Sequence, residues 1–109
     1  MHITIEALER YLAHRYKGWG IDQSMFMKLV EEMGEVAEVL NKMAGRKAND
    51  ENDLTEQLGI ELADMIHYIL AIAALHDIDM ERTILEKDKK ASVKYHHDIN
   101  LEQFLSGKC

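Results

Sequence analysis

The segment from Leu58 to Leu75 constrains the fold more than any other part of the sequence. It reads LGIELADMIHYILAIAAL, and its only acidic or basic side chains are Glu61, Asp64 and His67. A helix that is apolar almost all round needs other helices around it, so this one is expected at the centre of a bundle. The 109-residue chain contains no proline and is rich in helix-forming residues. We therefore predict one all-α domain, residues 1–109, resembling a four-helix bundle.

Cap residues and hydrophobic spacing predict where the other helices begin and end. Helices are expected after Thr4, from Asp22 or Ser24 to about Ala44, from Asp53 or Leu54 to His76, after Asp79, and as a short element after Asn100. The polar stretch between residues 46 and 54 is short, which makes the second helix and the central helix antiparallel neighbours.

The helix predicted near residues 22–44 has two unlike sides. At about 100° per residue, one side is an apolar stripe of Phe26, Leu29, Met33, Val36, Leu40 and Met43. The opposite side carries Lys28, Glu32, Glu35, Val39 and Lys42. Acids opposite an apolar stripe are usually solvated, so this side alone gives weak evidence of function.

Two acidic pairs share a three-residue spacing, Glu32 with Glu35 and Glu61 with Asp64. Residues three apart on a helix project from one face, so each pair can offer carboxylates to one ion. If the two helices are antiparallel, the pairs lie at similar heights along the bundle. Oxygen ligands without cysteine suit a hard cation, Mg²⁺ or Mn²⁺.

The apolar surroundings of Glu61 and Asp64 strengthen this interpretation. A buried carboxylate without a partner costs several kcal/mol, so these two acids need a cation, a basic side chain or a cleft. Salt bridges to Lys28, Lys42 or Arg46 remain an alternative. A single metal site would account for both acidic pairs.

The arrangement Glu31-Glu32-x-x-Glu35, a spacer, then Glu61-x-x-Asp64 resembles the signature of the MazG-like nucleotide pyrophosphohydrolases, which belong to the all-α NTP pyrophosphatase superfamily. LVEEMGEVAEVLNKM resembles the first motif helix of that family, and ELADMIHYILAIAALHDIDME resembles the second. The resemblance covers roughly residues 18–94.

The resemblance implies a Mg²⁺-dependent enzyme, with Mn²⁺ as a possible substitute, that hydrolyses nucleoside triphosphates to monophosphates and pyrophosphate. A role in clearing unwanted nucleotides is implied as well. Glu32, Glu35, Glu61 and Asp64 would hold the metal, and Glu31 would complete its shell or orient the attacking water beside Glu32.

Substrate contacts are expected from one aromatic and a few basic residues. Trp19, in a loop flanked by glycines, could stack on a base, although a lone tryptophan more often anchors a core or an interface. Lys28 could pair with a carboxylate or reach a phosphate. Lys87, Lys90 and Lys94 could clamp phosphates, and a solvated basic face is the alternative for them.

The charge of the chain restricts its partners. A formal net charge of −7 disfavours nucleic acid as a partner. The N-terminal residues do not read as a signal peptide, and the apolar run Met65–Leu75 is too short to span a bilayer, so a cytoplasmic protein without membrane contact is expected. The single Cys109 offers no internal disulfide. The apolar central helix favours a homodimer or homotetramer.

Two other functions stay open at this stage. A non-enzymatic helical regulatory or interaction protein would need its acids for solubility alone. A di-metal carboxylate bundle performing redox chemistry uses Glu-x-x-His pairs on two helices. Only Asp64-x-x-His67 approaches that pattern here.

Overall fold

The computed structural model describes residues 1–20, 23–45 and 53–107, and these residues form helices and no strand. The five helices are α1 (Ile5–Arg15), α2 (Ser24–Met43), α3 (Leu54–Leu75), α4 (Met80–Lys94) and α5 (Leu101–Leu105). The all-α fold class is therefore confirmed. Asp22, the predicted connection at residues 46–52, and Cys109 lie outside the described residues.

The predicted cap residues set the starts of α1, α3, α4 and α5, whereas α2 begins after Gln23, whose side chain forms no capping hydrogen bond. The side chains of Thr4, Asp53 and Asp79 each accept a hydrogen bond from a backbone N–H in the first turn of α1, α3 and α4. Asn100 and Gln103 form a reciprocal capping box at the start of α5. After α2, Gly45 takes a positive φ of 78°, which ends the helix without steric strain.

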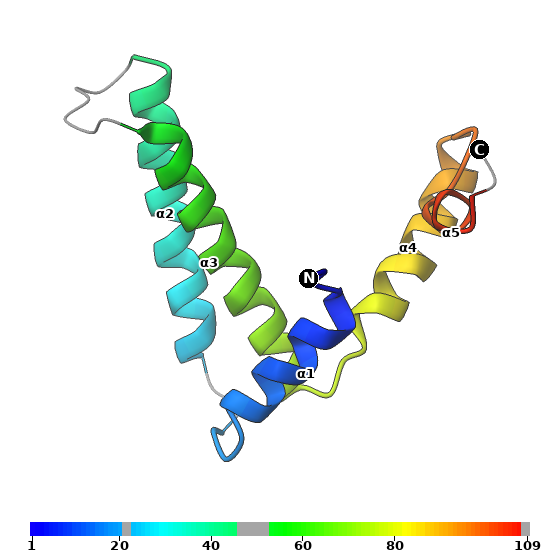
Figure 1. Cartoon of the computed structure of the whole chain (residues 1–109), viewed down its shortest axis with the longest axis horizontal. Helices are drawn as coiled ribbons and strands as arrows, with labels where there is room; N and C mark the ends of the chain where they lie inside the picture. The colour runs from blue at the N-terminus through cyan, green and yellow to red at the C-terminus, as the bar shows by residue number, and fades with distance from the viewer. Residues whose placement is uncertain (21–22, 46–52, 108–109) are drawn as a thin grey trace.

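The helices form two arms joined at α1 (Figure 1). α2 and α3 lie side by side and antiparallel, as the short connection predicts. α1 packs across the C-terminal half of α3, and its end lies near the start of α2. α4 contacts α1 at its beginning and then leads away from the α2–α3 pair, carrying α5 with it.

The main core lies where α1 meets the C-terminal end of α3 and the start of α2. Its buried members are Leu12, Tyr16, Met25, Leu70 and Ala71. Partly buried residues pack around them, among them Leu8, Tyr68, Ile72, Leu75 and Met80. This core fixes α1 and α3 relative to each other and holds the first turn of α2 in place.

The side of α2 that faces α3 differs from the sequence expectation. Met25 and Val39 are buried and Glu32 is half-buried against α3, although Glu32 and Val39 were predicted on the solvent-exposed side opposite the apolar stripe. Phe26, Met33 and Leu40, from the predicted apolar stripe, are exposed. α2 is rotated about its axis so that Glu32 faces α3, and much of the apolar stripe is left uncovered by the described residues.

α3 is likewise incompletely covered. It buries Leu70, Ala71 and Ala73, whereas Ile60, Leu62, Ile66 and Ile69 are exposed. By its 22-residue length and its composition alone it could cross a membrane, and little of its most apolar stretch is buried within the described residues. The central helix of a soluble bundle has the same character, and α3 carries two carboxylates in its middle.

Candidate metal centre

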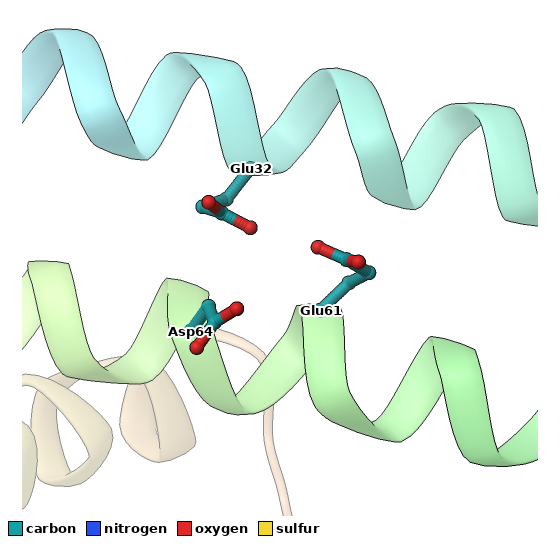
Figure 2. A group of neighbouring side chains, drawn as sticks. All are labelled: Glu32, Glu61 and Asp64. Atoms are coloured by element: carbon teal, nitrogen blue, oxygen red, sulfur yellow. The ribbon is translucent and has the colours of Figure 1, made fainter.

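Three carboxylates converge between α2 and α3. Glu32 points from α2 toward α3, and Glu61 and Asp64 point from α3 toward α2 (Figure 2). One oxygen from each of the three lies within 4.8 Å of the others. The two acidic pairs were predicted at similar heights on antiparallel helices, and the structure places members of both pairs together.

Two oxygen atoms in this group lack hydrogen-bond partners. Oε2 of Glu32 and Oε2 of Glu61 are buried and accept no hydrogen bond. An unsatisfied buried carboxylate oxygen is costly, and it is a natural ligand for a hard cation. The residues present therefore fit a divalent metal ion bound through oxygen, as the sequence predicts.

The raised pKa values of the clustered carboxylates also favour a bound cation. Hydrogen bonding with Glu35 and with Glu32, together with burial, raises the pKa of Glu61 to about 8. Burial raises the pKa of Glu32, and the nearby charge of Glu35 adds to this, while the hydrogen bond with Glu61 opposes it. These acids titrate together, so the cluster as a whole retains a proton that separate glutamates would lose.

The other predicted acids lie at the edge of this group. Glu35 reaches Glu61, since its hydrogen bond is the largest cause of the raised pKa there. Glu31 is exposed and forms an ion pair with Lys28, with Nζ and Oε2 3.8 Å apart. Glu38 is exposed too, as expected of a surface residue. The structure thus brings Glu32, Glu61 and Asp64 together and leaves Glu31 outside.

A second polar contact adjoins the carboxylates. His67, one turn after Asp64 on α3, lies with Nε2 2.7 Å from the hydroxyl of Tyr16 on the other side of the core. Burial lowers the pKa of His67, so its neutral ring can accept the Tyr16 O–H. The sequence did not single out Tyr16, because a contact across 51 residues leaves no local pattern.

This contact bears on the di-metal alternative. Nε2 of His67, the histidine of the Asp64-x-x-His67 pattern, is engaged by Tyr16. The ring is also packed edge-on against Tyr68. These contacts place His67 at the boundary of the core, where it packs against α1.

The candidate substrate residues are placed apart from one another. Trp19 is exposed and meets Tyr16 edge to face, with ring centroids 5.2 Å apart, so it stands near the α1 end of the α2–α3 pair. Lys87, Lys90 and Lys94 are exposed on α4, the helix that leads away from the acidic cluster. Within one chain these lysines do not join the carboxylates.

Comparison with known protein families identifies the chain's family. Residues 22–97 match the family model of the MazG nucleotide pyrophosphohydrolase domain, which covers more than half of the chain and includes Glu32, Glu61 and Asp64. No curated protein and no solved structure matches the chain significantly.

Proposed function

The chain belongs to the MazG nucleotide pyrophosphohydrolase family, and we propose that it hydrolyses nucleoside or deoxynucleoside triphosphates to monophosphates and pyrophosphate with Mg²⁺. The observation that carries this proposal is the convergence of Glu32, Glu61 and Asp64, with their oxygens within 4.8 Å and two of them buried without partners. Removal of unwanted nucleotides from the cell is the role that suits such an activity.

In this proposal Glu32, Glu61 and Asp64 hold the metal ion, and Glu35 completes the set from the adjacent turn of α2. A bound Mg²⁺ would neutralise the triphosphate oxygens and make a nearby water more acidic. Mn²⁺ has the same preference for oxygen ligands and could replace it. An acidic chain with a net charge of −7 needs such an ion to approach a triphosphate at all.

Glu31 is proposed to orient the attacking water beside Glu32. Its carboxylate is exposed and neighbours the cluster along α2, where it pairs with Lys28. Lys28 is proposed to exchange this ion pair for a phosphate oxygen when substrate binds.

Trp19 is proposed to contact the base, because its exposed ring packs edge to face against buried Tyr16 at the α1 end of the α2–α3 pair. Lys87 and Lys90 are proposed to contact phosphates. Because α4 leads away from the acidic cluster of its own chain, these lysines would serve the site of another subunit.

A substrate panel tests the reaction. The purified protein is incubated with each common ribo- and deoxynucleoside triphosphate and Mg²⁺ or Mn²⁺, and pyrophosphate and phosphate are measured separately. We expect pyrophosphate release from at least one nucleotide. Release of phosphate alone would place cleavage at the terminal phosphate, and no release from any nucleotide would leave the chain as a non-enzymatic interaction protein.

Matched variants test the site. Glu61→Gln and Asp64→Asn keep the shape of each side chain and remove its charge. Loss of a residue that hydrogen-bonds a metal ligand typically lowers activity roughly 10–100-fold, and we expect loss of a ligand itself to lower it at least as much. Glu86→Gln, an exposed acid on α4, is the control and should keep full activity. Circular dichroism should show that all three variants remain helical.

A further inference from the structure

Gln57 carries a buried oxygen atom that nothing in the chain satisfies. Among the described residues, four buried side-chain oxygens have no hydrogen-bond partner: Oε2 of Glu32, Oε1 of Gln57, Oε2 of Glu61 and Oγ of Ser92. Glu32 and Glu61 belong to the acidic cluster, whereas Ser92 lies on α4, which leads away from it. The proposed metal ligands account for the two glutamate oxygens and leave the amide oxygen of Gln57 without a role.

Gln57 lies on the face of α3 that carries the acidic cluster. At 100° per residue, Glu61 is rotated by about 40° from Gln57 and Asp64 by about 20° in the other direction, so the three side chains leave α3 within a narrow sector. Glu61 and Asp64 point toward α2 (Figure 2). Gln57 precedes Glu61 by about 6 Å along the helix axis, which is roughly one turn. Its side chain is therefore the next one along this face, on the side of Glu61 away from Asp64.

The neighbours of Gln57 on α2 supply no hydrogen-bond donor. α1 packs on the C-terminal half of α3, so the early turns of α3 are covered by α2. The helices are antiparallel and Glu35 hydrogen-bonds Glu61, which brings Val39, one turn after Glu35, to about the height of Gln57. Val39 is 1% exposed, and its side chain cannot donate a hydrogen bond. An ionised carboxylate only accepts. The amide oxygen therefore needs a donor from outside the chain.

A glutamine is an unfavourable choice at this position in the chain alone. A buried acceptor without a partner destabilises the fold, and an apolar side chain of the same shape in its place is neutral or stabilising. The half-buried residues beside it on α3, Leu54 and Leu58, are apolar, so the local packing suits such a side chain. The oxygen of Gln57 thus gains a purpose only when something binds between α2 and α3.

We propose that Gln57 is a positioning residue of the metal centre, whose Oε1 accepts a hydrogen bond from a water molecule that the bound cation carries. Mg²⁺ loses its waters reluctantly and is usually held by a few protein ligands together with several waters. An amide oxygen can fix such a water without adding another negative charge to those of Glu32, Glu61 and Asp64. The inference rests on the proposed function, because it requires the cation.

Binding of Mg²⁺ without nucleotide tests the proposal independently of hydrolysis. The wild type, Gln57→Met and Gln57→Glu are titrated with Mg²⁺ by calorimetry, and each is melted with and without the ion. Methionine keeps the length of glutamine and removes the oxygen, whereas glutamate keeps an oxygen in the same place. Gln23→Met is the matched control, because Gln23 is exposed at the start of α2 and its side chain forms no capping hydrogen bond.

The two substitutions at Gln57 should change metal affinity and stability in opposite directions. Gln57→Met should bind Mg²⁺ about 10–100-fold more weakly. Its melting temperature without metal should equal or exceed that of the wild type, because the unsatisfied oxygen is gone. Gln57→Glu should bind Mg²⁺ at least as tightly as the wild type and melt at a lower temperature without it, because a further carboxylate joins the cluster. Gln23→Met should match the wild type in both measurements.

Three results would overturn the proposal. Equal Mg²⁺ affinity of Gln57→Met and the wild type would show that the amide oxygen does not serve the ion, and a raised KM for nucleotide in that variant would assign the side chain to the substrate. A metal-free Gln57→Met that melts well below the wild type, or does not fold, would make Gln57 a structural residue. A wild type that binds neither Mg²⁺ nor Mn²⁺ would remove the metal centre itself. Only this last result also contradicts the proposed function.

Discussion

Binding of Mg²⁺ to the acidic cluster should release a proton, and the size of this effect follows from Glu61. Its pKa of about 8 means that at pH 7 roughly nine in ten molecules hold a proton on the cluster. A metal ion can use that carboxylate only after the proton leaves. The apparent affinity for Mg²⁺ should therefore rise about tenfold between pH 7 and pH 9, equivalent to about 1.4 kcal/mol.

Calorimetric titration measures both quantities. Mg²⁺ is titrated into the protein at pH 7 in two buffers with different ionisation enthalpies, and the difference in observed heat gives the number of protons released. We expect about 0.9 proton per bound ion, from the pKa of about 8. A second series from pH 6 to pH 9 gives the change in affinity.

Two variants locate the proton. Glu61→Gln should bind Mg²⁺ more weakly and lose most of the proton release, because the group that carries the proton is gone. Glu86→Gln, on exposed α4, should behave as the wild type. Binding without proton release and with constant affinity across this pH range would refute the reasoning, since Glu61 would then not take part in metal binding.

Three further results are expected. In denaturant titrations without divalent ions, the free energy of unfolding should fall as pH rises from about 4.5 through about 8, because the folded state keeps a proton on Glu61 that the unfolded state has lost. Addition of Mg²⁺ should reduce this decline. Leu12→Ala, in the core, should cost about 2–5 kcal/mol by the same assay, whereas Val93→Ala, exposed on α4, should cost little. Tyr16→Phe removes the hydrogen bond to His67 and should cost about 1–3 kcal/mol, read as a lower melting temperature at constant helical content.

The helix ends were predictable because their causes are local. Thr4, Asp53, Asp79 and Asn100 each cap a helix through a side chain that reaches three residues along the chain. The antiparallel placement of α2 and α3 follows from the short connection between them. The similar heights of the two acidic pairs follow in turn, whereas the meeting of Glu32 with Glu61 and Asp64 also depends on the rotation of α2 about its axis.

The orientation of α2 was not predictable in the same way. An apolar stripe indicates that something covers it, and the sequence does not state whether the cover is α3 or another chain. Glu32 and Met33 are adjacent, so a rotation of 100° exchanges their surroundings. The contact of Tyr16 with His67 depends on how α1 crosses α3, which no local pattern encodes.

The acidic cluster links metal binding to the contact between α2 and α3. Hydrogen bonding of Glu61 with Glu35 and with Glu32, together with burial, raises the pKa of Glu61 to about 8. Near neutral pH, the carboxylates of the two helices therefore share a proton. A bound cation would replace that proton as the positive charge between α2 and α3, so metal binding and deprotonation of Glu61 are expected to occur together.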